Sequence, residues 1–216
     1  MNVIDKIIKD KISFLKKDAL TNLKSNVLKI NNIEGDIIET GCALGGSSIC
    51  IAFYKNKNKN FNIYDVFGMI PEPTDKDDKD VHDRYSVIKS GKSKGIKGDI
   101  YYGYRDNLLE EVKNNFKIYN INPETNNINF IKGLYKDTLF ITRPVAFANI
   151  DCDYYDPVMN SLNQIVPKLS INGILTIDDY YCWSGSRKAV DEYFKKIKKN
   201  YKFEKVARRL NIIRIS

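Results

Sequence analysis

The chain has 216 residues, of which 43% are hydrophobic and 29% are charged, and its formal net charge is +8. This length suits one domain with a sizeable core, and the composition is ordinary for a soluble globular protein. The basic excess is mostly lysine spread over the whole length, without an arginine-rich stripe or a recognisable nucleic-acid motif. We therefore expect no nucleic-acid partner and only a mild attraction to anionic small molecules.

The hydropathy and the cysteines of the chain indicate its cellular setting. No apolar stretch reaches membrane-spanning length, and the lysine-rich amphipathic N-terminus has no signal-peptide core. The cysteines form no Cys-x-x-Cys pair, which is typical of reduced thiols. They are Cys42, Cys50, Cys152 and Cys182. We expect a cytoplasmic protein that makes no membrane contact.

The predicted elements alternate between helices and short strands. Residues 1–33 form a helical N-terminal extension, in one or two pieces, because their apolar residues recur near a 3.6-residue period. Apolar runs predict strands at 36–39, 61–64, 127–132, 145–150 and 173–177. Helices are predicted over 45–52, 104–118, 157–169 and 186–199, and a terminal hairpin over 202–206 and 211–215.

Residues 66–103 are rich in Pro, Gly, Asp and Lys and show little periodicity. This segment is too long for an ordinary connection, so we predict a lid or a substrate loop. No repeat or linker divides the chain, and residues 1–216 are expected to form one domain. The fold class is α/β: a Rossmann-like, mostly parallel sheet with right-handed crossovers and a C-terminal antiparallel hairpin.

Acidic residues stand at the carboxyl ends of four of the predicted strands. They are Glu39, Asp65, Asp151 and Asp178. Open parallel sheets bind their ligands at the carboxyl ends of the strands. These four side chains are therefore expected to converge in space.

The turn after the first strand runs Glu39-Thr40-Gly41-Cys42-Ala43-Leu44-Gly45-Gly46-Ser47-Ser48. Its glycines allow close backbone approach to a ligand, but the spacing fits neither a dinucleotide motif nor a P-loop. Glu39 suits a cationic amine on the ligand, and Asp65 suits both hydroxyls of a ribose. A plain tight turn and loop acids are the alternative. Together the residues describe a nucleoside with an amino-acid-like cation and no polyphosphate, which S-adenosylmethionine fits.

Two acidic clusters follow the fourth and fifth strands. One is Ile150-Asp151-Cys152-Asp153-Tyr154, and the other is Thr176-Ile177-Asp178-Asp179-Tyr180. Carboxylates at the ends of apolar strands repel one another and are costly to desolvate. Helix caps and loop acids are the alternative for a single cluster, whereas two neighbouring clusters favour a divalent metal with oxygen ligands.

Several stretches together resemble the macrocin-type sugar O-methyltransferases, which methylate deoxysugars of macrolide and aminocoumarin antibiotics. They run from about residue 35 to 195 in family order: Gly35–Gly41 with Gly45–Ser48, Tyr64–Gly68, Ile131–Leu139, Ile150–Asp156, Pro167–Gly173, Ile177–Tyr180 and Ser186–Tyr193. The resemblance implies an S-adenosylmethionine-dependent fold and a bound Mg²⁺. It departs after Gly133, where Leu-Tyr replaces an aromatic pair, and in the long insert.

The resemblance also implies roles for single residues. Asp151, Asp178 and Asp179 would hold the Mg²⁺, and Asp151 is also the candidate general base. Asp153 would either support the metal ligands from outside or orient Tyr154. The cofactor-binding set is Glu39, Thr40, Gly41, Gly45, Gly46, Ser47, Ser48, Asp65 and Gly133. The candidate substrate contacts are His82, Tyr154, Tyr180 and Trp183, for which a surface histidine and core aromatics are the alternatives.

The leading functional interpretation is a Mg²⁺-dependent O-methyltransferase. Its acceptor would be a small-molecule sugar, nucleotide-linked or glycosidic, in bacterial polysaccharide or natural-product biosynthesis. A phenol or catechol O-methyltransferase and a non-catalytic cofactor-binding module are the alternatives. The apolar stripes of the N-terminal helices need a cover, either their own domain or a second copy of the chain, and of these we expect a homodimer.

Overall fold

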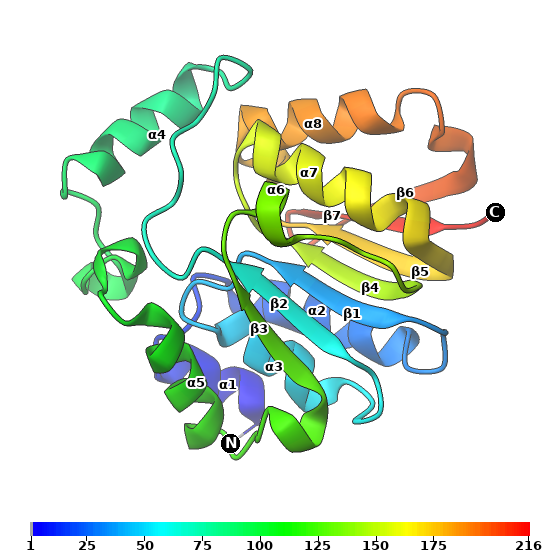
Figure 1. Cartoon of the computed structure of the whole chain (residues 1–216), viewed down its shortest axis with the longest axis horizontal. Coiled ribbons are helices and arrows are strands. Elements are labelled where there is room, and N and C mark those ends of the chain that lie inside the picture. Colours follow the sequence, from blue (N-terminus) through cyan, green and yellow to red (C-terminus); the bar gives the residue numbers. More distant parts are fainter. Residues whose placement is uncertain (1) are drawn as a thin grey trace.

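A single seven-stranded sheet organises the computed structural model, which describes residues 2–216. The strand order is β3-β2-β1-β4-β5-β7-β6 (Figure 1). The strands are β1 (Asp36–Thr40), β2 (Phe61–Asp65), β3 (Ile128–Lys132), β4 (Val145–Ile150), β5 (Leu169–Ile177), β6 (Tyr201–Val206) and β7 (Arg209–Arg214). Strands β1 to β5 pair in parallel, whereas β7 runs antiparallel to both β5 and β6. The predicted Rossmann-like sheet with a C-terminal hairpin is confirmed.

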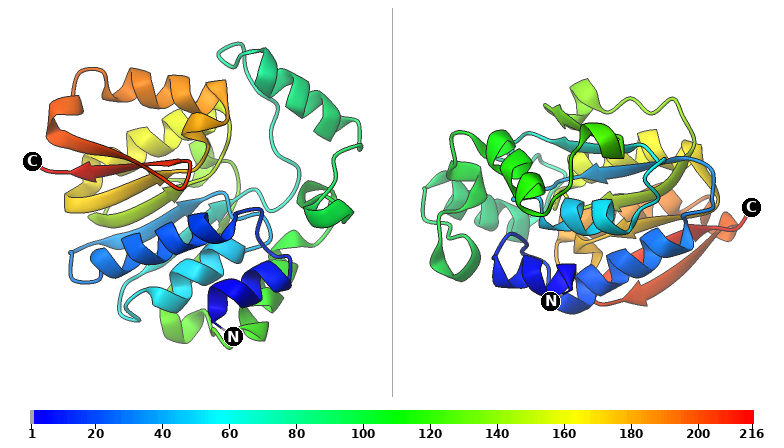
Figure 2. Two further views of the ribbon diagram at one scale, coloured as in Figure 1. Left: turned by 180° about the vertical axis from the view of Figure 1, so that it is seen from behind. Right: turned by 90° about the horizontal axis from the view of Figure 1, so that it is seen from below.

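Helices cover both faces of the sheet. They are α1 (Val3–Lys9), α2 (Lys17–Lys29), α3 (Gly46–Tyr54), α4 (Lys79–Lys89), α5 (Leu108–Ile118), α6 (Tyr135–Thr138), α7 (Tyr155–Ile165) and α8 (Ser184–Phe194). Figure 1 shows α7 and α8 on one face, and Figure 2 shows α1, α2 and α3 on the other. Successive side chains of a strand point to opposite faces, so Ile37 packs with the α2 side and Ile38 with the α7 side. Because helices cover both faces, every residue of β1 and β4 is buried.

The N-terminal helices pack on their own domain. Leu20, Leu23 and Val27 of α2 are fully buried in the core that contains Ile37. Asn26 of the same helix donates from Nδ2 to Thr176 Oγ1 at 3.0 Å. The apolar stripe is therefore covered within the chain, which removes the argument from which a homodimer was expected; the dimer stays a prediction.

The insert 66–103 contains a helix that the periodicity did not predict. In α4 only Val81 and Ile88 are buried, seven residues apart, which is too few apolar positions to produce a visible helical pattern. Other boundaries differ modestly from expectation. The predicted helix over 157–169 begins at Tyr155 and ends at Ile165, and β5 already begins at Leu169. Within residues 2–216, no helix has both the length and the apolar character that crossing a membrane requires.

Candidate active site

The carboxyl ends of the central strands are aligned by hydrogen bonds that continue beyond the strands. Gly41 donates its backbone N–H to Tyr64 O at 2.9 Å, and Asp151 donates to Thr40 O at 2.9 Å. Asp178 N donates to Ile150 O at 3.0 Å. The turns after β2, β1, β4 and β5 therefore lie side by side, which brings the predicted acids to one edge of the sheet.

Gly41 allows the turns after β1 and β4 to touch. Its φ is +90°, a conformation that side-chain-bearing residues rarely adopt. A Cβ atom at this position would lie 1.7 Å from the backbone oxygen of Asp151. Any larger residue would push the Asp151 loop away, so Gly41 fixes the approach of the two loops.

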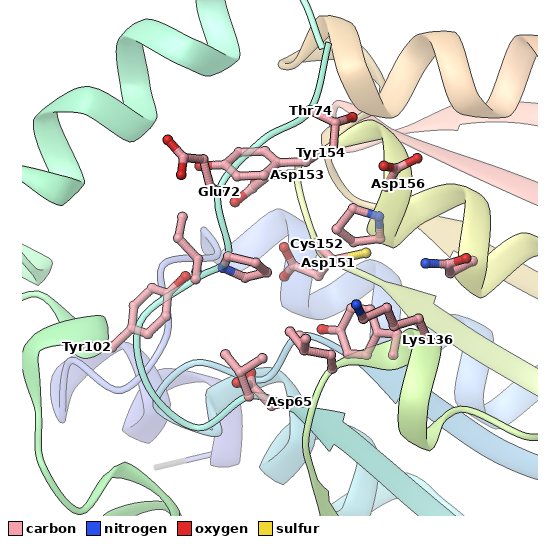
Figure 3. A pocket seen from close by; sticks show the side chains of 18 residues that line it. Asp65, Glu72, Thr74, Tyr102, Lys136, Asp151, Cys152, Asp153, Tyr154 and Asp156 are labelled. Carbon is pink, nitrogen blue, oxygen red and sulfur yellow. The ribbon is translucent and has the colours of Figure 1, made fainter. Parts of the chain in front are cut away.

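A cavity of about 460 Å³ opens at this edge. Gly41, Asp65, Asp151 and Asp153 line it from the strand ends, and residues 70–72 and 74 line it from the insert. Figure 3 shows these side chains around the cavity, with Tyr102 on the side of the insert and Lys136 on the side of α6. We refer to this space as the first cavity.

A second cavity of about 250 Å³ adjoins the first. Gly41, Asp65, Tyr102, Asp151 and Asp153 line both cavities. The second cavity adds Asp178, Asp179, Trp183, Arg84 of α4, and residues 12–15, which lie between α1 and α2. The carboxylates after β4 therefore stand where the two cavities meet.

Asp65 is buried between the turns after β1 and β2. Its carboxylate accepts hydrogen bonds from the backbone N–H groups of Cys42 at 2.7 Å, Ala43 at 3.2 Å and Phe67 at 2.7 Å. Burial raises the pKa of Asp65, and these backbone donors act against that rise. Asp65 thus fixes the turns on each side of it while it also faces both cavities.

Glu39 lies behind the site and lines neither cavity. It is fully buried, accepts a hydrogen bond from the Ser48 hydroxyl, and accepts another from Asn149 Nδ2 at 2.9 Å. Burial raises the pKa of this carboxyl to about 7. The structure therefore does not bring Glu39 to the cavity where a cationic amine would bind.

Only some of the other predicted cofactor contacts line one of the two cavities. Gly41, Gly46 and Ser47 line a cavity, whereas Thr40, Gly45, Ser48 and Gly133 do not. Directly after Gly133, Leu134 and Tyr135 line the first cavity, so this stretch reaches the site through its next residues.

Two of the four predicted substrate contacts line one of these cavities. Tyr154 lines the first cavity and Trp183 the second. The Tyr180 hydroxyl donates to Asp191 Oδ1 at 2.7 Å, and His82 is exposed, with Nε2 at 3.2 Å from Thr74 O. Neither Tyr180 nor His82 lines the first or the second cavity.

Three carboxylates form the compact acidic group of the site. Oxygens of Asp151, Asp153 and Asp179 all lie within 4.8 Å of one another. The predicted trio contained Asp178 in place of Asp153. Asp178 instead forms an ion pair with Arg209 Nε, while Asp153 adopts a φ of +58° at the turn.

The acidic group has the electrostatics of a cation site. Burial, followed by the charge of Asp178, raises the pKa of Asp151 well above its ordinary value. Burial, followed by the charge of Asp153, does the same for the pKa of Asp179. Asp179 Oδ2 is buried and has no hydrogen-bond partner among residues 2–216. Hard carboxylate oxygens with an unpaired buried atom fit a hard divalent cation such as Mg²⁺.

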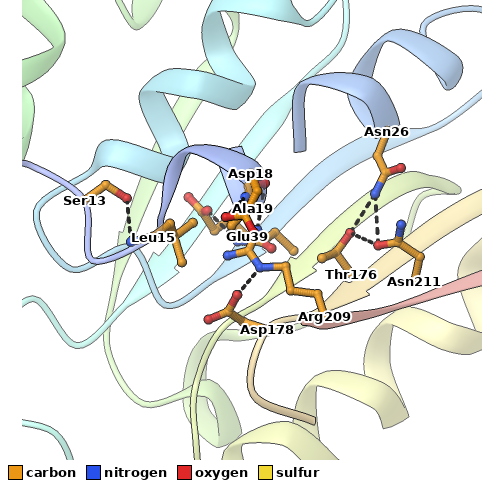
Figure 4. A network of polar contacts seen from close by, with 11 residues as sticks. Ser13, Leu15, Asp18, Ala19, Asn26, Glu39, Thr176, Asp178, Arg209 and Asn211 are labelled. Atoms are coloured by element: carbon orange, nitrogen blue, oxygen red, sulfur yellow. Dashed lines mark hydrogen bonds and ion pairs between the residues drawn. The ribbon is translucent and has the colours of Figure 1, made fainter. Parts of the chain in front are cut away.

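Arg209 is a site residue that the sequence did not reveal. It is only 2% exposed, and its Nη1 donates to Ala19 O at 3.0 Å in the first turn of α2 (Figure 4). Its guanidinium thus joins α2 to Asp178 from the hairpin between β6 and β7. A hairpin pattern carries no signal that one of its arginines is buried, so only the tertiary structure identifies it.

The comparisons with known proteins agree with this geometry. The sequence model described as Macrocin-O-methyltransferase (TylF) matches residues 12–209. The chain is 30% identical over 170 residues to the demethyldecarbamoylnovobiocin O-methyltransferase of Streptomyces niveus, covering 76% of this chain and 59% of that protein. It is 28% identical over 170 residues to the mycinamicin III 3''-O-methyltransferase of Micromonospora griseorubida, covering 76% of this chain and 61% of that protein. These matches therefore span about three fifths of the length of the curated relatives.

Solved structures show the same likeness. The O-methyltransferase NovP superposes with a TM-score of 0.78 at 26% identity, covering 95% of this chain and 83% of that one. The calicheamicin methyltransferase CalS11 superposes with a TM-score of 0.65 at 13% identity, covering 98% of this chain and 91% of that one, and shares the fold alone. With the family match over most of its length, the chain belongs to the macrocin O-methyltransferase (TylF) family.

Proposed function

We propose that this protein is a divalent-metal-dependent O-methyltransferase that moves a methyl group from S-adenosylmethionine to a sugar hydroxyl. The observation that carries the proposal is the acidic group of Asp151, Asp153 and Asp179, which stands where two cavities meet. Methyl transfer needs donor and acceptor in adjoining spaces, with the acceptor oxygen held in line with the methyl group.

The first cavity suits S-adenosylmethionine. The turn at Gly41 lets backbone approach the ligand, and Asp65 stands at the end of β2, where an acid can accept from ribose hydroxyls. Val66, Leu134 and Tyr135 supply an apolar wall for the adenine. The family membership of the chain supports the same ligand.

The charge balance of the second cavity supports a divalent cation. Five aspartates line it: Asp65, Asp151, Asp153, Asp178 and Asp179. Three backbone N–H groups hold Asp65, and Arg209 pairs with Asp178. The lining also includes Arg84, whose charge lowers the pKa of Asp153 after burial has raised it. When ionised, the three other carboxylates and Arg84 leave two negative charges, which one divalent ion would offset. Asp151, Asp153 and Asp179 would hold it, and when bound it would lower the pKa of an acceptor hydroxyl.

The chain's own carboxylates complete the reaction. The acceptor oxygen forms a bond to the methyl carbon, the bond between that carbon and the sulfonium sulfur breaks, and S-adenosylhomocysteine leaves as a neutral thioether. The hydroxyl proton passes to a carboxylate, and Asp151 is placed for this role because it lines both cavities. General-base assistance of this kind contributes roughly 10²- to 10⁴-fold.

The second cavity favours a sugar over a phenol. Its lining includes the five aspartates, Ser13, Ser47 and Arg84, with Trp183 and Tyr101 as aromatic walls. Polar groups beside an aromatic face suit the hydroxyls and the apolar face of a sugar ring, whereas a flat phenol would need an apolar slot. One relative is named for a rhamnosyl tetracenomycin substrate, which also supports a sugar acceptor.

The test is a methyl-transfer screen against nucleotide-linked sugars, glycosides and catechols, read by mass spectrometry. The proposal expects a mass gain of one methylene on a sugar, together with S-adenosylhomocysteine formation. Methylation of catechols alone would establish the phenol alternative. An absence of S-adenosylmethionine binding by calorimetry would contradict the proposal altogether.

A further inference from the structure

The insert 66–103 is fastened to the two helices that follow the acidic loops. Helix α7 begins directly after the Asp151–Tyr154 loop, and α8 begins directly after the loop of Asp178 and Asp179. Neither helix is capped by its own N-cap side chain. The first N–H groups of a helix have no partner within the helix, so an outside acceptor is needed.

Two aspartates of the insert supply these caps. Asp77 Oδ1 accepts from Tyr155 N, the first amide of α7, at 2.8 Å. Asp80 Oδ2 accepts from Ser184 N, the first amide of α8, at 3.0 Å, and Asp80 also accepts from the Ser184 hydroxyl. Figure 1 shows the chain that precedes α4 reaching the start of α8. We refer to these two caps as the latch.

Asp77 is built into its position. It is only 7% exposed, and its other oxygen accepts from Thr74 N at 3.1 Å. A Cβ atom at Gly185 would lie 2.2 Å from Asp77 Oδ1, so the glycine leaves the space that the carboxylate occupies. Nearby, Lys76 Nζ pairs with Asp156 at 3.2 Å, and Lys188 Nζ donates to Lys76 O at 2.8 Å.

The latch joins two segments that line the first cavity. Ile70, Pro71 and Thr74 line it just before Asp77, and Tyr154 and Pro157 line it on either side of Tyr155. Opening of the Asp77–Tyr155 bond would let these two segments separate. It would also free the amide at the end of the loop that carries Asp151 and Asp153.

We propose that Asp77 is a positioning residue for methyl transfer: through Tyr155 N it holds the insert over the first cavity and fixes the Asp151–Tyr154 loop. Asp80 supports it through α8. Asp77 itself touches no reacting atom. This inference rests on the proposed function for its catalytic meaning, while the mechanical coupling can be measured independently of it.

The experiment compares the full-length wild-type protein with Asp77→Ala, Asp77→Asn, Asp80→Ala and the exposed control Asp75→Ala. Amide hydrogen exchange over residues 151–157 reports the loop, and calorimetry with S-adenosylhomocysteine reports the first cavity. We expect Asp77→Ala to speed exchange in this stretch and to weaken S-adenosylhomocysteine binding about five- to tenfold, the size of a lost helix cap. Asp77→Asn should recover most of the exchange protection and of the affinity, because its Oδ1 can accept from Tyr155 N, although its Nδ2 cannot accept from Thr74 N. Asp75→Ala should match wild type.

Unchanged exchange and affinity in Asp77→Ala would overturn the inference, as would an Asp77→Asn variant no better than Asp77→Ala. If Asp77→Ala does not fold, Asp80→Ala takes its place, with a smaller change expected in the same direction and no change overturning the latch. A wild-type protein that fails to bind S-adenosylhomocysteine would instead contradict the proposed function. The exchange measurement would still decide whether Asp77 fixes the loop.

Discussion

The amino ends and the carboxyl ends of the parallel strands, called here the amino edge and the carboxyl edge of the sheet, differ in whether their buried charges have partners. At the amino edge, the buried Lys55 ammonium donates to four backbone carbonyls, among them Lys59 O at 2.9 Å and Asn126 O at 2.6 Å. At the carboxyl edge, Asp151, Asp153 and Asp179 crowd together, and Asp179 Oδ2 has no partner among residues 2–216. A buried charge with all its partners holds the fold together, whereas crowded like charges indicate a ligand from outside the chain.

The largest expected effect separates the acidic group from the fold. Asp151→Asn should lower turnover at least about a hundredfold, because it removes a metal ligand and the proposed base together. The free energy of unfolding of the metal-free protein should stay the same or rise, since one like charge is removed. Methyl-transfer kinetics and urea unfolding check the two parts. Wild-type turnover in this variant would remove Asp151 from the mechanism.

Glu39 is an intermediate case: a buried acid that lies behind the site and has hydrogen-bond partners within the chain. Below pH 4.5 its carboxyl is protonated in both folded and unfolded chains, and between pH 4.5 and about 7 only the unfolded chain loses the proton. Wild type should therefore lose up to about 3 kcal/mol of stability across this window relative to Glu39→Gln, and no more above it. Urea unfolding of both proteins from pH 4 to 8 measures the difference, and parallel curves would refute the raised pKa.

Asp178 should behave unlike its neighbour Asp151. Asp178→Asn leaves the buried Arg209 guanidinium without its ion-pair partner, so the free energy of unfolding should fall by about 2 kcal/mol or more. This differs from the simple expectation that removing any of the clustered acids relieves repulsion. Thermal or urea unfolding decides it. An equally stable Asp178→Asn protein would show that Arg209 does not depend on this pair.

A substitution at Lys55 changes the amino edge of the sheet without touching the cavities at the carboxyl edge. Lys55→Met keeps the length of the side chain but leaves Lys59 O and Asn126 O without their donor, which should cost about 2 kcal/mol of stability. The affinity for S-adenosylmethionine should not change, because Lys55 lines neither cavity. Urea unfolding and calorimetry on one preparation compare the two quantities. A loss of affinity at unchanged stability would reverse the roles assigned to the two edges.

Local patterns in the sequence were sufficient to predict the strands whose ends form the site. The strands predicted over 36–39, 61–64, 145–150 and 173–177 correspond to β1, β2, β4 and β5, and parallel topology then required the acids at their carboxyl ends to meet. The contrast between Asp153 and Asp178 was not predictable in this way. It depends on Arg209, whose partners at Ala19 and Asp178 are distant in the sequence.

The insert was harder still to predict. Its latch consists of Asp77 and Asp80 meeting the first amides of α7 and α8, and such pairings leave no periodic trace. Glu39 follows the same logic: its position in the turn suggested a ligand contact, but Ser48 and Asn149 occupy its carboxylate oxygens. Where a polar side chain finds its partner is decided by tertiary packing.

The most direct test of the central claim is methyl transfer by the purified wild-type protein before and after metal removal. Excess EDTA should abolish product formation and Mg²⁺ should restore it, while a calorimetric titration should give one divalent site per chain that Asp151→Asn loses. Full activity in excess EDTA would show that methyl transfer needs no divalent metal and would leave Asp151, Asp153 and Asp179 as structural residues.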